Sequence, residues 1–213
     1  DERAAAHDRI RVRRGILAQA DRNILYIDEI NLLSDEIIDS ILDAAAQGSY
    51  TVRRGPLAAT YRSRFVLVGS MNPEEGRLRP QILDRFGLRV IVKGLKDAGE
   101  RLEAYRRVNA WLENPRQMIA QFSAEMEAAA DEIRTARERV KNVKLPDEVA
   151  NPAIHLVQKM GVDSLRAEIT WFEAARAYAA ADGRDEVTFD DLKAVAPMTL
   201  RLRRSSYMNE YFK

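Results

Sequence analysis

The chain has 213 residues, enough for one large domain or two small ones, and its 34 basic and 33 acidic side chains leave a net charge of only +1. That balance does not indicate a nucleic-acid-binding surface, the absence of cysteine excludes disulfides and cysteine-based zinc sites, and two distant histidines disfavour a histidine-built metal site. No apolar run approaches the roughly 18 residues that a membrane span needs, and the first ten residues lack the apolar core of a signal peptide, so we expect a cytoplasmic location.

The first predicted elements lie between residues 23 and 61. Residues 23–29 are strongly apolar until their last two positions, which is typical of a short buried strand. Residues 34–46 then place apolar side chains at helical spacing, with Ser34 as N-cap and Gly48 as a C-terminal stop. Two strand-like pieces around a Gly-Pro turn predict a hairpin over residues 50–61.

Three further elements complete the predicted α/β part. Residues 64–70 form a second buried strand in this interpretation, because they are again strongly apolar. Residues 80–86 begin with a proline at an early helical position and predict a short helix, which Gly87 closes. The apolar run over residues 88–92 predicts a third strand.

After about residue 96 almost every segment is predicted to be helical. The expected helices cover residues 97–112, 117–141, 145–161, 163–183 and 188–197, with breaks or stops at Pro115 and Pro197. The second of them has a thin near-heptad apolar stripe, so we expect it to pack closely on a neighbour. The sequence therefore predicts an α/β domain over residues 1–95 and an all-helical domain over residues 96–213.

The pair Asp28-Glu29 at the end of the first strand is the strongest candidate for chemistry. In nucleoside triphosphatases an Asp at such a strand end orders Mg²⁺, and a following Glu takes a proton from the attacking water or orients it. Two adjacent carboxylates at the end of a central strand would be costly without a cation or ordered water to balance them. The alternative is a plain acidic strand end that leads into a turn.

Three more polar residues are candidates, each with a plainer alternative. Asn72 follows the second strand and is placed to bind a phosphate oxygen and the attacking water, or else it forms an ordinary Asn-Pro turn. Arg85 is placed to supply a cation to a phosphoryl transition state in a neighbouring subunit, whereas the alternative is a surface salt bridge between Asp84 and a nearby base. Arg166 lies in the predicted first turn of a helix, where a cation opposes the helix dipole; a functional anion nearby would explain it, and the alternative is a solvated arginine.

Two long runs of the chain carry a family resemblance. The runs Asn23–Leu33 and Arg64–Leu88 closely resemble the ATPase subunit of magnesium chelatase, a member of the AAA+ superfamily in the clade of the MoxR-type ATPases. The most specific stretch is Asn-Pro-Glu-Glu-Gly followed by Leu-Arg-Pro-Gln-Ile-Leu-Asp-Arg-Phe. The similarity continues through residues 143–147 and 161–169, so it covers nearly the whole chain.

The resemblance implies a role for each candidate residue. Asp28 and Glu29 match the Walker B pair, Asn72 matches sensor 1, Arg85 the arginine finger and Arg166 the sensor 2 arginine. Residues 50–62 match the hairpin inserted before sensor 1. The implied fold is an incomplete AAA+ P-loop core, a parallel sheet with helices, followed by an all-helical lid domain.

One departure from the family pattern concerns phosphate binding. The chain contains no Gly-x-x-x-x-Gly-Lys-Ser/Thr, the Walker A loop whose backbone amides and lysine hold the phosphates. Family members carry that loop upstream of the position that matches the first residue of this chain. We therefore expect the 213 residues to be the C-terminal part of a longer protein and to be inactive alone; the alternative is a homologue that never had the loop.

The resemblance also implies a function for the full-length protein. It indicates an ATP-hydrolysing ring motor, a hexamer in our expectation, that uses ATP and Mg²⁺ and drives insertion of Mg²⁺ into protoporphyrin IX by a partner subunit with a von Willebrand A (VWA) domain. In a plant or alga its location would be the plastid stroma. The alternatives are a MoxR-type or cobaltochelatase-type remodelling ATPase with another VWA partner, and a non-catalytic ring scaffold.

Overall fold

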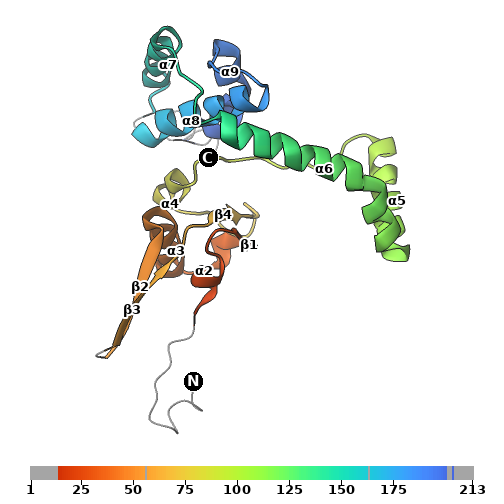
Figure 1. Ribbon diagram of the computed structural model, residues 1–213. Helices are drawn as coiled ribbons and strands as arrows, with labels where there is room; N and C mark the ends of the chain where they lie inside the picture. The colour runs from red at the N-terminus through yellow and green to blue at the C-terminus, as the bar shows by residue number, and fades with distance from the viewer. Residues whose placement is uncertain (1–13, 56, 163, 201–202, 204–213) are drawn as a thin grey trace. The chain divides into compact units, whose positions relative to one another are not determined.

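The chain divides into two structural units, residues 1–85 and residues 86–213 (Figure 1). The structure, a computed structural model, describes residues 14–55, 57–162, 164–200 and 203. The first unit contains strands and short helices and the second is helical, which is the order of classes that the sequence predicted. The domain boundary that we expected after residue 95 stays a prediction.

Two parallel strands form the sheet of the first unit. Strand β1 (Ile24–Ile27) pairs with β4 (Val66–Gly69), with Ile24 opposite Val66 and Ile27 opposite Gly69. Side chains alternate between the two faces of a strand, so Leu25 is buried while its neighbours on either side are exposed. The second face of the sheet is apolar and open to solvent; its side chains are Ile24, Tyr26, Val66 and Val68.

Helix α3 (Asp35–Gln47) follows β1 after the short helix η1 (Ile30–Leu32). Its buried side chains include Ile38 and Leu42, which recur at helical spacing as the sequence predicted. Gly48 ends the helix in the left-handed region with a φ of 65°, a conformation that favours glycine, and its N–H donates to the Ala44 carbonyl.

The predicted hairpin is present and projects from the end of α3 (Figure 1). It consists of β2 (Ser49–Arg54) and β3 (Leu57–Arg62), which pair antiparallel. The Tyr50 and Tyr61 rings stack with centroids 5.6 Å apart, and the buried Ser63 hydroxyl donates to the Ala44 carbonyl at 2.9 Å. The base of the hairpin is therefore fastened to α3.

Two short helices complete the first unit. Helix α2 (Ile16–Gln19) precedes β1, and α4 (Pro80–Arg85) lies against α3, with Ile82 almost fully buried. The early proline of α4 fits the preference for proline at the first helical positions. The prediction of a helix beginning at residue 80 is confirmed.

The prediction of a third strand over residues 88–92 is wrong. The structure describes these residues as irregular, and Val90 and Val92 expose 73% and 90% of their surface. One backbone hydrogen bond, from the Arg89 N–H to the Met198 carbonyl, anchors the segment. A strand needs hydrogen bonds to the backbone of a neighbouring strand, and among the described residues this apolar run has no such neighbour.

A helical arm opens the second unit (Figure 1). Helix α5 (Ala98–Glu113) leads into α6 (Pro115–Arg139), whose 25 residues span about 37 Å, and neither helix buries a residue. The packing that we expected along α6 is found only near its ends. Residues Ala136 and Val140 pack on the helical core, whereas Met126 exposes 66% of its surface.

Three helices form the core of the second unit: α7 (Asp147–Lys159), α8 (Leu165–Ala181) and α9 (Phe189–Thr199). On α8 the side chain of Trp171 is 2% exposed, and its indole N–H donates to the Leu192 carbonyl at 2.7 Å. Thr188 forms the predicted capping box of α9 with Asp191. This arrangement is the helical lid expected from the sequence.

The expected stop of the last helix at Pro197 is wrong. Pro197 lies inside α9, which continues to Thr199. Proline removes a single hydrogen bond, the one that its own N–H would donate to the residue four positions earlier. The N–H of Leu200 still donates to the Ala196 carbonyl, so the last turn is retained.

Candidate functional site

Asp28 lies at the carboxyl edge of the sheet, where ligands bind in open α/β folds. Its Oδ1 accepts a hydrogen bond from the Tyr26 hydroxyl at 2.9 Å and a second from the Ser70 hydroxyl. Ser70 is the first residue after β4, so the parallel register brings it beside Asp28. The Ser70 hydrogen bond first, and the Tyr26 bond second, lower the pKa of Asp28 below its usual value, which keeps the carboxylate ionised.

Glu29 combines a fixed backbone with a free side chain. Its φ of 50° and ψ of 50° lie in the left-handed region, which is uncommon for a residue other than glycine. The Glu29 N–H donates to the Ser70 hydroxyl oxygen at 3.1 Å. Its exposed carboxylate makes no ion pair or hydrogen bond among the described residues and is therefore available to a ligand.

Asn72 offers a donor rather than an acceptor. Its side-chain oxygen accepts the Glu74 N–H at 3.1 Å, and its main-chain carbonyl accepts the Glu75 N–H at 3.1 Å. The turn that we considered as the plainer alternative is therefore present. It leaves the side-chain amide nitrogen without a partner among the described residues, and that nitrogen can still donate to a phosphate or a water.

Arg85 ends α4 and pairs with acids of its own chain. Its Nη1 lies 2.9 Å from an Asp43 carboxylate oxygen and 3.6 Å from an Asp39 oxygen, both on α3. The alternative to the arginine-finger role was a surface salt bridge with Asp84 as the acid. Arg85 does form ion pairs, but with the two acids of α3. The Arg85 side chain keeps an exposed fraction of 36%.

Arg166 is the second residue of α8 and is exposed, in the first helical turn as predicted. It belongs to the second unit, whereas the other four candidates belong to the first. The structure thus brings Asp28, Glu29 and Asn72 to one edge of the sheet. The sensor 2 role of Arg166 stays a prediction.

The sequence reasoning did not identify two residues of this edge. Ser70 contacts both acids of the Asp-Glu pair, through the side chain of Asp28 and the backbone of Glu29. Tyr26 adds the second donor to Asp28. Placing the two apolar runs in parallel register would have revealed Ser70, because it follows the second run where Asp28 follows the first.

The edge fits a magnesium ion that is bound largely by phosphates. Among the described residues no group of three or more His, Cys, Asp or Glu side chains could hold a metal by itself. Mg²⁺ in nucleotide sites commonly takes one or two carboxylates, with waters and phosphate oxygens as its other ligands. Asp28 suits that role, because its carboxylate is exposed and the Tyr26 and Ser70 hydroxyls fix it through Oδ1.

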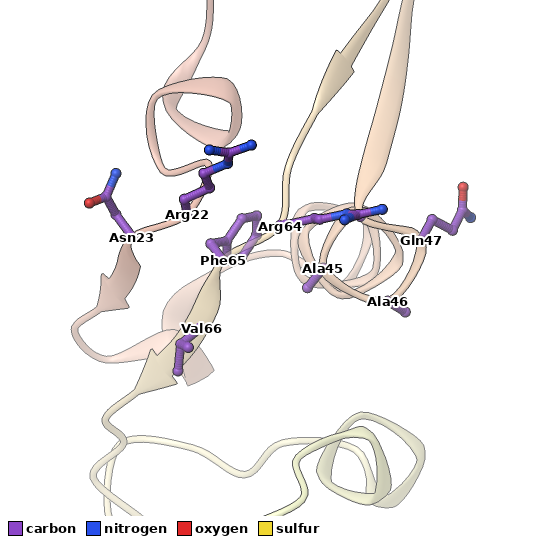
Figure 2. A pocket seen from close by; sticks show the side chains of 9 residues that line it. Arg22, Asn23, Ala45, Ala46, Gln47, Arg64, Phe65 and Val66 are labelled. Atoms are coloured by element: carbon purple, nitrogen blue, oxygen red, sulfur yellow. The ribbon is translucent and has the colours of Figure 1, made fainter. Parts of the chain in front are cut away.

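A pocket of about 550 Å³ lies at the opposite end of the strands (Figure 2). Arg22 and Arg64 line it together with Phe65 and the last turn of α3. The Arg64 side chain lies over Gly48, where an added Cβ would come within 3.0 Å of it. A cation near a helix C-terminus is favourable by itself, so the position of Arg64 at the end of α3 has a structural explanation.

Two family models match parts of the chain. The model described as magnesium chelatase, subunit ChlI, matches residues 7–81, which include β1, α3 and β4. The model described as AAA lid domain matches residues 151–211, which include α8 and α9. In the described part of the chain no helix has the length and apolarity to cross a membrane.

Similar proteins agree with these matches. A magnesium-chelatase subunit ChlI homolog of Methanocaldococcus jannaschii is 46% identical over 195 residues, covering 91% of this chain and 53% of that protein. The magnesium-chelatase 38 kDa subunit of Acidiphilium rubrum is 46% identical over 189 residues, with shares of 89% and 55%. A crystal structure of a putative ATPase from Cytophaga hutchinsonii shares the fold, with a TM-score of 0.65 at 22% identity over 89% of this chain and 61% of that one.

The chain spans about half the length of the relatives it matches. The family models match both of its units, one in the strand-containing part and one in the lid. The relatives extend the similarity over most of the 213 residues. The chain therefore belongs to the magnesium-chelatase ChlI family of AAA+ ATPases.

Proposed function

We propose that the full-length protein is an ATP-hydrolysing ring motor in which this chain supplies every named catalytic group except the phosphate loop. The observation that carries the proposal is the edge where β1 and β4 end. There an ionised Asp28, a free Glu29 carboxylate and the Asn72 amide nitrogen follow two paired strands. Two hydroxyl donors fix the position of the Asp28 carboxylate and favour its charged form, which supports a metal-binding role over that of a non-catalytic scaffold.

Each residue has a distinct part in the proposed reaction. Bound Mg-ATP supplies the phosphoryl group and the metal that offsets its developing charge. Asp28 orients a magnesium-bound water or binds the ion, while Glu29 accepts the proton of the attacking water. Asn72 donates its amide hydrogens to the phosphate or the water. Arg85 serves the site of the next subunit, and Arg166 contacts the nucleotide from the lid.

The open face of the sheet supports the view that more of the protein packs here. Ile24 exposes 67% of its surface and Tyr26 58%, and both lie on one side of β1. A parallel sheet is normally covered on both faces, and two strands alone are marginal. We propose that further strands of the full-length protein, with the phosphate loop, complete this sheet. The 213 residues alone are not expected to hydrolyse ATP.

The process that we propose the motor drives is the insertion of Mg²⁺ into protoporphyrin IX. A VWA-domain partner carries out the insertion, and a hexamer of this subunit drives it. The relatives are named as magnesium-chelatase subunits, which favours this process over that of a MoxR-type or cobaltochelatase-type ATPase. We further propose that the protein works in the cytoplasm, or in the plastid stroma of a plant or alga.

The test of the ATPase proposal uses Glu29→Gln in the full-length protein. This change keeps the size of the side chain but removes the base, so turnover should fall by about 100-fold or more while nucleotide binding survives. Asp28→Asn should instead weaken the dependence of the rate on Mg²⁺. Glu36→Gln, an exposed change on α3, is the matched control and should leave the rate unchanged. Full ATPase activity of Glu29→Gln would contradict the proposal and favour a plain acidic strand end.

A further inference from the structure

Helix α3 carries a stripe of acids whose arrangement needs an explanation. Asp35, Asp39 and Asp43 are spaced four residues apart, so they lie one above the other on the same helix face. Like charges at this spacing destabilise a helix by about 0.2–0.5 kcal/mol per pair. Only Asp35 lies in the first turn, where an acid gains from the helix dipole.

The counter-charges come from both ends of α4. Arg79 Nε lies 2.9 Å from an Asp35 oxygen, and Arg79 Nη2 lies 3.2 Å from an Asp39 oxygen. Asp39 also faces Arg85, whose remaining partner is Asp43. Between the two arginines the side chain of Ile82 is 1% exposed. Ile82 is thus the buried anchor of α4 on α3, and a row of alternating charges runs beside it.

The contacts of Arg85 leave most of its guanidinium free. Both acids approach the same nitrogen, Nη1, at 2.9 Å and 3.6 Å. The Nε and Nη2 donors make no hydrogen bond or ion pair among the described residues. A guanidinium has five N–H donors in a rigid fork, so fixing one nitrogen orients the others.

We propose that Asp43 and Asp39 are positioning residues that orient Arg85 toward the nucleotide of the neighbouring subunit. The inference rests on the proposed function of Arg85 and names the groups on which that function depends. All three side chains are at least 36% exposed, so the pairs add little to folding stability. Their effect is instead to restrict a long side chain with many rotamers to one direction.

The test is Asp43→Asn in the full-length assembled protein, compared with Asp35→Asn. Asp43→Asn should lower kcat by about tenfold or more, with the KM for ATP unchanged, because a misplaced group costs rate at the chemical step. Asp35→Asn removes a similarly exposed acid of the same stripe, whose ion pair among the described residues is with Arg79 and not with Arg85, and its kcat should stay within about twofold of wild type. Asp43→Glu, which keeps the carboxylate, should recover most of the lost rate.

A coupled measurement separates orientation of Arg85 from a general effect on α3. In an Arg85→Lys background the finger is already impaired, so adding Asp43→Asn should cause no further loss of kcat. A merely structural Asp43 would lower the rate by the same factor in both backgrounds. Equal losses in the two backgrounds, or equal effects of Asp35→Asn and Asp43→Asn, would overturn the inference.

The outcome also shows which of the two proposals fails. If Arg85→Ala keeps its ATPase activity, the finger role is wrong, and the positioning role fails with it. If Arg85→Ala is inactive but Asp43→Asn turns over at the wild-type rate, the finger role stands and only the positioning role is wrong. Circular dichroism and the oligomeric state of each variant confirm that the comparison is made between folded, assembled proteins.

Discussion

A mixture of two inactive variants should regain ATPase activity if Arg85 serves the neighbouring subunit. A Glu29→Gln subunit keeps its arginine finger but has an inactive catalytic site. An Arg85→Ala subunit keeps its own catalytic site but supplies no arginine to its neighbour. Neither variant alone forms a complete site. In a mixed ring, some interfaces pair the intact Glu29 of one subunit with the intact Arg85 of the next, and those interfaces should turn over.

The structure indicates that Arg85→Ala removes function without unfolding the chain. The two ion pairs of Arg85 connect exposed side chains, so their loss should cost about 1 kcal/mol or less. The buried Ile82 that fastens α4 is untouched. An arginine supplied in trans is worth about 1,000-fold or more in phosphoryl transfer, so the variant should be almost inactive but folded.

The measurement is phosphate release against mixing ratio, after subunit exchange between the two full-length variants. If x is the fraction of one variant and the interfaces act independently, the productive fraction is x(1 − x). The curve is therefore a dome with a maximum of about one quarter of the wild-type rate at equal amounts. The rates of the two unmixed variants, which should be near zero, define the two ends of the curve.

A flat line at zero, with exchange confirmed by labelled subunits, would refute the shared site. Arg85 would then act within its own subunit or only as the partner of Asp39 and Asp43. A rate that rises linearly toward one pure variant would mean that this variant is active alone. Mixing either variant with itself after labelling is the control for losses during exchange.

Two further predictions concern pKa values that hydrogen bonds lower. Ser70→Ala removes the main donor that lowers the pKa of Asp28, so that pKa should rise and the acid limb of the kcat/KM profile of the full-length ATPase should move to higher pH. In the lid, Arg184 first and then Thr188 lower the pKa of Asp191, so the carboxylate stabilises the fold above its ordinary pKa of 3.8 and loses this effect as the pH falls through the lowered value. Asp191→Asn should lower Tm at pH 7 and have a shrinking effect below pH 3.8 in thermal unfolding; an equal effect at both pH values would contradict this.

The elements that the sequence predicted well carry local signals. Gly48 stops α3 because a left-handed cap favours glycine, and Thr188 starts α9 because its side chain can satisfy the free N–H of Asp191. The two apolar runs that became β1 and β4 were recognised as strands for a similar reason, since length and composition alone indicate a strand. The expected burial of the second run is wrong, because β4 contains no buried residue in this structure. Such features need no knowledge of the rest of the chain.

The features that could not be predicted from the sequence depend on residues far away along the chain. The run over residues 88–92 is as apolar as β4, but a strand needs a neighbour and this run has none among the described residues. Ser70 became a site residue only through the register that places it beside Asp28, 42 positions earlier. The acids that face Arg85 are likewise 42 and more positions away on α3, so the sequence analysis named the adjacent Asp84 instead.

The ion pairs of Arg85 and its proposed finger role involve one side chain, and their magnitudes decide which prevails. A finger worth about 1,000-fold in rate stabilises the transition state by about 4 kcal/mol. The exposed pairs with Asp39 and Asp43 are worth about 1 kcal/mol or less. The acids therefore cannot withhold Arg85 from a phosphoryl group within its reach. Without that group, they are strong enough to favour one rotamer, so the same pairs that resemble a surface salt bridge can prepare the arginine for the neighbouring site.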